Sequence, residues 1–223
     1  MNLLLIFKII SSYSVLIMLG VSLRCAYSLL RNKNFNKNYW LFSLVVTMST
    51  IETIMNFLFS VVLKSTGIYV NIIFYTQKLY LIIEVVTIVY FYIKLFKDIN
   101  EKKEILEKEL TAFLFATLIA IFIGIKYDKL ILLITILESI IINYFFIKLL
   151  FRGILEEKKI RFKYQEIINR GLFTFINLIS PYSIINEIIS ETNQPIYITL
   201  NFINDLGYIY FFNSLYKSAK CYR

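Results

Sequence analysis

Histidine is missing from the whole sequence of 223 residues. Its absence excludes His-ligated metal sites, Ser-His catalytic triads and histidine proton shuttles. Cysteine is nearly as rare, with Cys25 and Cys221 as the two examples. Both fall on the side that the basic residues assign to the cytoplasm, where thiols stay reduced, so we predict free thiols without a disulfide. We expect no metal site.

Glycine and proline are also scarce, with six and two residues. The sequence has no glycine-rich phosphate-binding loop and no GxSxG nucleophile motif. Residues 156–161 match the EExxxR pattern of intramembrane CAAX-type proteases, but those enzymes also need histidines. Seven-helix retinal proteins need a lysine in the middle of the last span, and this chain has none there. We therefore predict a protein that is not an enzyme and holds no cofactor.

Charged residues make up only 17% of the chain, whereas hydrophobic residues make up 58%. A soluble domain has about 25% charged residues. The hydrophobic residues are gathered in stretches of roughly 20, the length that a helix needs to cross about 30 Å of hydrocarbon. The sequence therefore predicts an all-α polytopic membrane protein that forms one transmembrane domain over residues 1–223.

Seven membrane-spanning helices are predicted. They cover residues 3–23, 40–63, 70–92, 110–125, 130–151, 167–190 and 195–216. The sixth is the least apolar and contains Pro181, which lacks a backbone donor and predicts a kink. If the sixth segment were interfacial or re-entrant, six spans would remain and the carboxyl terminus would lie outside. The basic residues after position 216 favour seven.

The basic residues predict the orientation. Eighteen of them follow the first, third, fifth or seventh predicted span, whereas four lie on the opposite side. Because basic loops stay in the cytoplasm, we predict an outer amino terminus and an inner carboxyl terminus in a bacterial cytoplasmic (inner) membrane. This topology explains the net charge of +9. Anionic headgroups at the inner loops would add about 1 kcal/mol per basic residue, and we expect no nucleic-acid partner.

Four acidic residues lie near the middle of separate predicted spans: Glu52, Glu84, Glu138 and Asp205. A carboxylate at this depth costs about 3 kcal/mol or more, so we predict that the four side chains gather inside the bundle. If they cluster, they cannot all be ionised, because desolvation and like charges favour the neutral form. A site of this kind would bind a proton, a cation or an amine.

Four further residues complete the predicted site. Asn143 and Asn201 are candidate ligands, because each lies four or five residues from one of the acids on the same span. Lys78 and Arg170 are the basic side chains at membrane depth, and we consider them as counter-charges. The alternative for each acid is that it is protonated or satisfied locally and serves helix packing.

Three segments carry a resemblance to known proteins: STIETIMNFLFS around Glu52, YLIIEVVTIVYFYIKLF around Glu84, and LNFINDLGYIYFFNSL around Asp205. With the basic stretches between them, the layout resembles small uncharacterised bacterial seven-helix membrane proteins. It is also similar to the seven-helix sensory regions of some histidine kinases. The resemblance implies a membrane sensor or signalling partner.

We interpret the chain as an integral membrane receptor-like or signalling protein that binds a small ligand or a protein partner through its acid-lined core. The alternative is a proton- or cation-coupled transporter or an oligomeric pore, in which the acids line a path. Transporters often contain repeats with paired broken helices; the sequence shows no convincing repeat, but a kink at Pro181 keeps the alternative open. Expected partners are the lipid bilayer, a cytoplasmic protein and, in a homo-oligomer, further copies of the chain.

Overall fold

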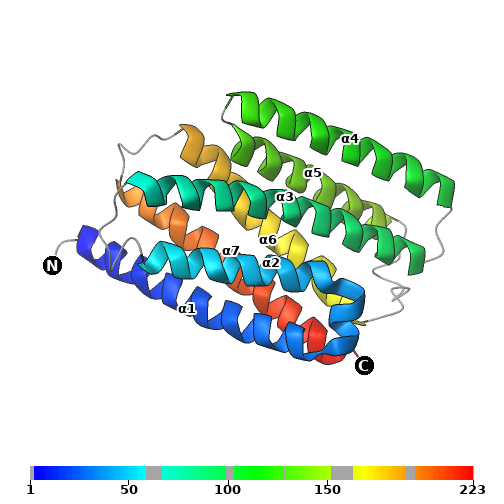
Figure 1. Ribbon diagram of the computed structural model, residues 1–223, viewed down its shortest axis with the longest axis horizontal. Coiled ribbons are helices and arrows are strands. Elements are labelled where there is room, and N and C mark those ends of the chain that lie inside the picture. Colours follow the sequence, from blue (N-terminus) through cyan, green and yellow to red (C-terminus); the bar gives the residue numbers. More distant parts are fainter. Residues whose placement is uncertain are drawn as a thin grey trace.

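The computed structural model describes residues 3–58, 67–98, 103–127, 129–151, 163–188 and 194–222. These residues form seven α-helices that run back and forth along one long bundle (Figure 1). The helices are α1 (Leu3–Arg31), α2 (Lys33–Phe57), α3 (Gly67–Asp98), α4 (Lys103–Tyr127), α5 (Leu130–Phe151), α6 (Lys163–Ile188) and α7 (Gln194–Cys221). The all-helical prediction is confirmed, and Pro181 lies inside α6, which continues past it.

Within the described part of the chain, three segments are long and apolar enough to cross a membrane, Tyr13–Arg31, Lys78–Lys97 and Leu130–Leu150, and Thr111–Lys126 is a shorter apolar stretch. These findings support a membrane protein. The other helices carry more polar residues; α6, for example, contains Asn169, Asn177 and Asn186. Seven spans and the orientation therefore stay predictions.

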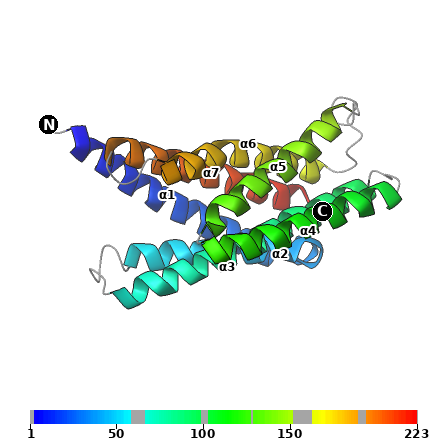
Figure 2. The ribbon, with the colours of Figure 1, turned by 90° about the horizontal axis from the view of Figure 1, so that it is seen from above.

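Six of the helices form a closed ring. Helix α1 packs between α2 and α7, α2 packs on α3, α3 on α5, α5 on α6, and α6 on α7. In Figure 2, α6 and α7 lie on one side of the bundle, α2 and α3 lie on the other, and α1 and α5 cross between them. Helix α4 is outside this ring and packs mainly on α5. The ring therefore has an interior to which α4 does not contribute.

The outer surface of α4 is strongly apolar. Phe115, Leu118 and Phe122 on this helix are 64%, 65% and 73% exposed. Soluble proteins rarely expose large apolar side chains in a continuous patch of this kind. In a bilayer the same side chains would face lipid, which is consistent with the composition of the chain.

Helices α6 and α7 make the most extensive contact in the bundle, and Gly171 lies at their closest approach. A Cβ atom placed on Gly171 would be 2.7 Å from the Cβ atom of Ser214 on α7. Small residues at a helix interface let two backbones approach closely, and this is the main route to tight packing between membrane helices. The close packing of α7 on α6 therefore requires a residue without a Cβ atom at position 171.

One end of the bundle, which we call the Asn32 end, contains the α1–α2 junction and the last turn of α7. The Asn32 side chain caps α2 by accepting a hydrogen bond from the Phe35 backbone N–H (3.0 Å) and donates to the Ala219 carbonyl oxygen (2.7 Å). The Lys94 ammonium of α3 donates to the Asn38 carbonyl oxygen and lies 4.6 Å from the centre of the Tyr39 ring. These contacts tie α1, α2, α3 and α7 together. Cys25 and Cys221 are free thiols, the first buried and the second exposed.

Candidate acid-lined site

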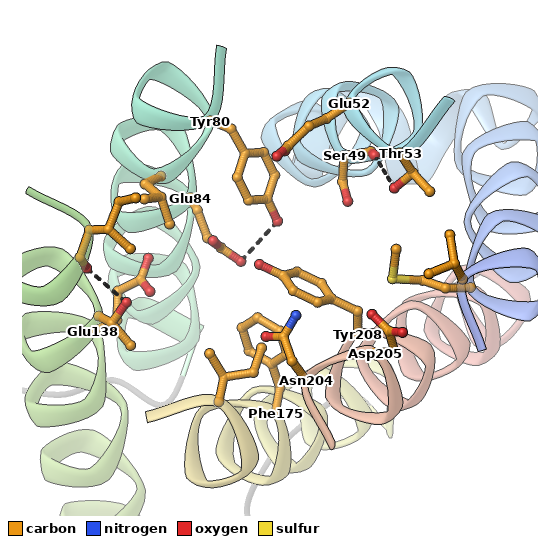
Figure 3. A pocket seen from close by; sticks show the side chains of 16 residues that line it. Ser49, Glu52, Thr53, Tyr80, Glu84, Glu138, Phe175, Asn204, Asp205 and Tyr208 are labelled. Carbon is orange, nitrogen blue, oxygen red and sulfur yellow. Dashed lines mark hydrogen bonds between the residues drawn. The ribbon is translucent and has the colours of Figure 1, made fainter. Parts of the chain in front are cut away.

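The six helices of the ring enclose a cavity of about 270 Å³ (Figure 3). Each of them contributes lining side chains, and α4 contributes none. The lining residues are Val15 and Met18 of α1; Ser49, Glu52 and Thr53 of α2; Tyr80, Leu81 and Glu84 of α3; Ile131, Thr135 and Glu138 of α5; Phe175 and Ile179 of α6; and Asn204, Asp205 and Tyr208 of α7.

All four acidic residues singled out from the sequence line this one cavity: Glu52, Glu84, Glu138 and Asp205. They come from four different helices. Glu84 and Glu138 are each 2% exposed, and Asp205 is 7% exposed. The structure therefore brings together side chains that are up to 153 positions apart in the chain, the separation between Glu52 and Asp205.

Two of the carboxyl groups have hydroxyl partners. The Tyr80 hydroxyl donates to Oε1 of Glu84 (3.2 Å), one turn along the same helix. The Ser14 hydroxyl donates to Oδ2 of Asp205 and joins α1 to α7. Figure 3 shows the hydroxyl of Tyr208 pointing toward Glu84 and Tyr80, and its oxygen is within hydrogen-bonding reach of the Tyr80 hydroxyl.

Glu138 is different, because its Oε1 atom is buried and has no hydrogen-bond partner among the described residues. The hydroxyl of Thr135, one turn away, donates to the Ile131 carbonyl oxygen of the same helix. The Glu84 carboxyl is close enough to interact with Glu138 electrostatically, but as a second acid it cannot neutralise a negative charge on Glu138. A buried polar atom without a partner costs about 1–3 kcal/mol, so a donor that reaches Oε1 of Glu138 would stabilise the protein.

Among the residues that the structure describes, no lysine or arginine lines the cavity. Arg170 of α6 is largely exposed and pairs with Glu166 on the same helix (2.8 Å), away from the acids. Lys78 of α3 is also outside the lining. The two expected counter-charges are therefore not placed at the site. Within the described residues, no three acidic or cysteine side chains come close enough to hold a metal ion together.

The two asparagines expected at the site are also outside the lining. The Asn143 side-chain amide donates to the Ser139 carbonyl oxygen (2.8 Å) and accepts from the Asn177 amide of α6 (3.2 Å), so it serves the α5–α6 contact. Asn201 lies one turn from Asp205, and it is Asn204 that lines the cavity instead.

Sequence reasoning missed several polar side chains of the lining. Most of them lie three or four residues from an acid: Ser49 before Glu52, Tyr80 before Glu84, Thr135 before Glu138, and Tyr208 after Asp205. Residues at this spacing share one face of a helix. A search for hydroxyl groups three or four residues from each mid-span acid would have found these four.

Four buried phenylalanines, which we call the aromatic layer, form a chain of ring contacts on the Asn32 side of the cavity. Phe175 lines the cavity and stacks on Phe211 with ring centres 4.8 Å apart. Phe211 contacts Phe42 (6.3 Å), and Phe42 contacts Phe91 edge to face (5.9 Å). Each of the four is at most 1% exposed. This aromatic layer joins α2, α3, α6 and α7 across the interior of the ring.

A second polar contact lies beyond the aromatic layer. The hydroxyl of Tyr92 on α3 donates to Oδ1 of Asn169 on α6 (2.9 Å). Nδ2 of Asn169 is buried without a hydrogen-bond partner among the described residues, as is the Ser43 hydroxyl oxygen of α2. Buried groups of this kind are usually satisfied by ordered water.

Comparison with protein-family models, with curated proteins and with solved structures finds no match for this chain.

Proposed function

We propose that the chain is an integral membrane receptor-like protein that binds a small ligand in the acid-lined cavity. The observation that supports this most is Glu138, a buried carboxyl that points into the cavity with one oxygen unpartnered. A protein keeps a destabilising group of this kind when another molecule supplies the missing partner. The cavity volume of about 270 Å³ suits a ligand somewhat smaller than those in the 300–1,000 Å³ range that is usual for drug-sized molecules.

The aromatic layer supports binding in preference to passage through the bundle. Phe42, Phe91, Phe175 and Phe211 are buried and in contact between the cavity and the Asn32 end, and a layer of this kind would hinder the passage of ions there. We place the Asn32 end in the cytoplasm of a bacterial cell, since the basic residues gather at this end, and the cavity then faces the outer side. The helix ends that are joined at the Asn32 end would contact anionic headgroups and a cytoplasmic signalling partner.

Access to the cavity can be tested by thiol labelling. In a background with Cys25 and Cys221 replaced by serine, Ser49→Cys places a thiol on the lining and Ser43→Cys places one outside it. We expect a small membrane-impermeant methanethiosulfonate ammonium reagent to label Ser49→Cys in right-side-out vesicles and to leave Ser43→Cys unlabelled. The extent of labelling is measured by mass spectrometry.

The same experiment can overturn the proposal. If Ser49→Cys is not labelled from the outer side in correctly folded protein, the cavity is not an outward-facing binding site. Equal labelling of both variants would show a continuous water-filled path and would contradict the barrier proposed at the aromatic layer.

Proton- or cation-coupled transport is the second candidate, and the orphan Nδ2 atom of Asn169 favours it. This donor would suit a water molecule on the far side of the aromatic layer, and such a water would lie on the path of a transported proton after the layer opens. For the receptor we expect proteoliposomes with an internal pH-sensitive dye and an imposed gradient to be as tight as empty vesicles. Flux that Glu84→Gln abolishes would establish transport and would overturn the receptor proposal.

A further inference from the structure

We infer that the ligand is a small organic amine whose ammonium group pairs with the carboxylate of Glu138. This inference rests on the proposed function and names the chemistry of its ligand. Its starting point is the partner that Glu138 lacks: Oε1 is a buried acceptor and the residue is 2% exposed. An N–H or O–H donor satisfies such an atom, and a positively charged N–H donor forms the shorter and stronger bond.

The charge of the lining excludes an anion and favours a cation. Around the cavity lie four carboxyl groups, several hydroxyl groups and one amide, and none of the lining residues is basic. An anionic ligand would have no counter-charge there and would meet the carboxyls. A cation supplies the positive charge that the structure does not place at the site.

The apolar side of the lining indicates that the cation is organic. Six lining residues have apolar side chains without a hydroxyl group, and the rings of Tyr80 and Tyr208 lie beside Glu84 (Figure 3). Aromatic faces attract ammonium groups, and aliphatic side chains pack against a hydrocarbon tail. An ammonium group between Glu138 and Glu84 would leave the tail against residues such as Ile131, Phe175 and Ile179. A bare metal ion would use none of these contacts.

Proton release accompanies binding of such a ligand. The titratable groups that face Glu138 are Glu84 and Tyr80 from α3, Glu52 from α2, and Tyr208 and Asp205 from α7. Helices α1 and α6 present apolar side chains to the cavity, and α4 presents none. Four carboxyl groups that share one buried cavity cannot all be ionised, because like charges and burial disfavour the charged form, so a proton is available for release at this site. The arriving ammonium keeps its proton, the Glu138 carboxyl loses its own to the solvent, and an ion pair forms.

The test uses n-butylammonium chloride as the probe and n-butanol as its uncharged equivalent, with the purified protein in nanodiscs. Binding is followed by calorimetry in two buffers with different ionisation enthalpies, because the difference between the two heats counts released protons. We expect butylammonium to bind and release about one proton, with an affinity that rises up to about tenfold per pH unit. We expect butanol to bind at least tenfold more weakly.

Substitutions test whether Glu138 is the residue that contacts the ammonium group. We expect Glu138→Gln to lower the affinity for butylammonium at least thirtyfold, Glu138→Asp to lower it less, and Glu166→Gln to leave it unchanged. Glu166 is the matched control because it is an acid on the surface of α6, outside the lining. Equal affinity of Glu138→Gln and wild type would overturn the assignment, and equal binding of butanol would overturn the role of charge. Thermal unfolding of each variant shows that it is folded.

The outcomes separate this inference from the proposed function. If Ser49→Cys is labelled from outside but butylammonium does not bind, the outward-facing cavity stands and the amine is the wrong ligand class. If Ser49→Cys is not labelled, the proposed function itself fails. Binding of butylammonium without proton release would keep the amine and overturn the exchange with the Glu138 proton.

Discussion

Replacing Glu138 by glutamine is expected to stabilise the empty protein. The carboxyl is buried, one of its oxygens has no hydrogen-bond partner among the described residues, and the titratable group that acts on it is another acid, Glu84. Glutamine has the same shape and adds an N–H₂ group that the Glu84 carboxyl can accept from. Removing the unpartnered acid should recover part of its cost of about 1–3 kcal/mol. We expect the free energy of unfolding to rise by about 1 kcal/mol in titration of micelle-bound protein with sodium dodecyl sulfate.

The control for this prediction is Glu166→Gln, which removes an exposed i, i+4 ion pair with Arg170. Such pairs contribute about 0.3–0.5 kcal/mol, so this variant should be marginally less stable. The two acid-to-amide substitutions thus have opposite expected signs. A loss of more than about 2 kcal/mol in Glu138→Gln would show that Glu138 has a structural partner in the folded bundle. A stabilised variant that no longer binds butylammonium would show that Glu138 is kept for binding at the expense of stability.

Adding one methyl group at Gly171 is expected to loosen the α6–α7 interface. The new Cβ atom of Gly171→Ala would lie 2.7 Å from the Cβ atom of Ser214, so one of the two helices has to shift. Overpacking of this kind costs about 1–3 kcal/mol. Because α7 carries Asp205 and Tyr208, the shift should also weaken ligand binding. The free energy of unfolding and the affinity for butylammonium are measured together.

Gly20 on α1 is the matched control, because it is exposed and a Cβ atom there would meet nothing within 4 Å. Gly20→Ala should leave the protein as stable or raise its stability by up to about 1 kcal/mol, since alanine is the better helix former. The second variant, Gly171→Ala combined with Ser214→Gly, removes the atom that the methyl group meets. We expect it to recover most of the lost stability. If the double variant is as unstable as Gly171→Ala alone, the clash with Ser214 is not the cause.

The location of the acids could be predicted from depth alone, but their neighbours could not. Mid-span carboxyls are costly in contact with lipid, and this cost suffices to predict that Glu52, Glu84, Glu138 and Asp205 face inward. Asn143, which the sequence suggested as a ligand, lies outside the lining for a geometric reason. Five residues turn a helix by about 140° beyond a full circle, so the Asn143 side chain points away from that of Glu138. Counting the rotation in addition to the depth would have removed it.

The ring itself could not be predicted from the sequence. Helix α4 is apolar on most of its surface, so its pattern does not say which side faces a neighbour, and its place outside the ring depends on how the other helices pack. The aromatic layer could not be predicted from the sequence either. Phe42, Phe91, Phe175 and Phe211 come from four helices, and nothing in their local sequence distinguishes them from the phenylalanines that face outward. Seven helices of suitable length follow from the hydrophobic stretches, whereas their order in space does not.

The closed ring has a consequence for how the protein is made. Among the seven described helices, α1 is synthesised first and α7 last, yet α7 packs beside α1 and completes the ring. Until α7 is inserted, one side of the cavity is missing, so the carboxyl groups of α2, α3 and α5 are not fully enclosed. The Ser14 hydroxyl also lacks its acceptor, Asp205. Chains released before this step would present carboxyl groups to lipid, where each of them costs about 3 kcal/mol or more. Insertion of α7 is therefore the step that completes the burial of the acids on the other helices.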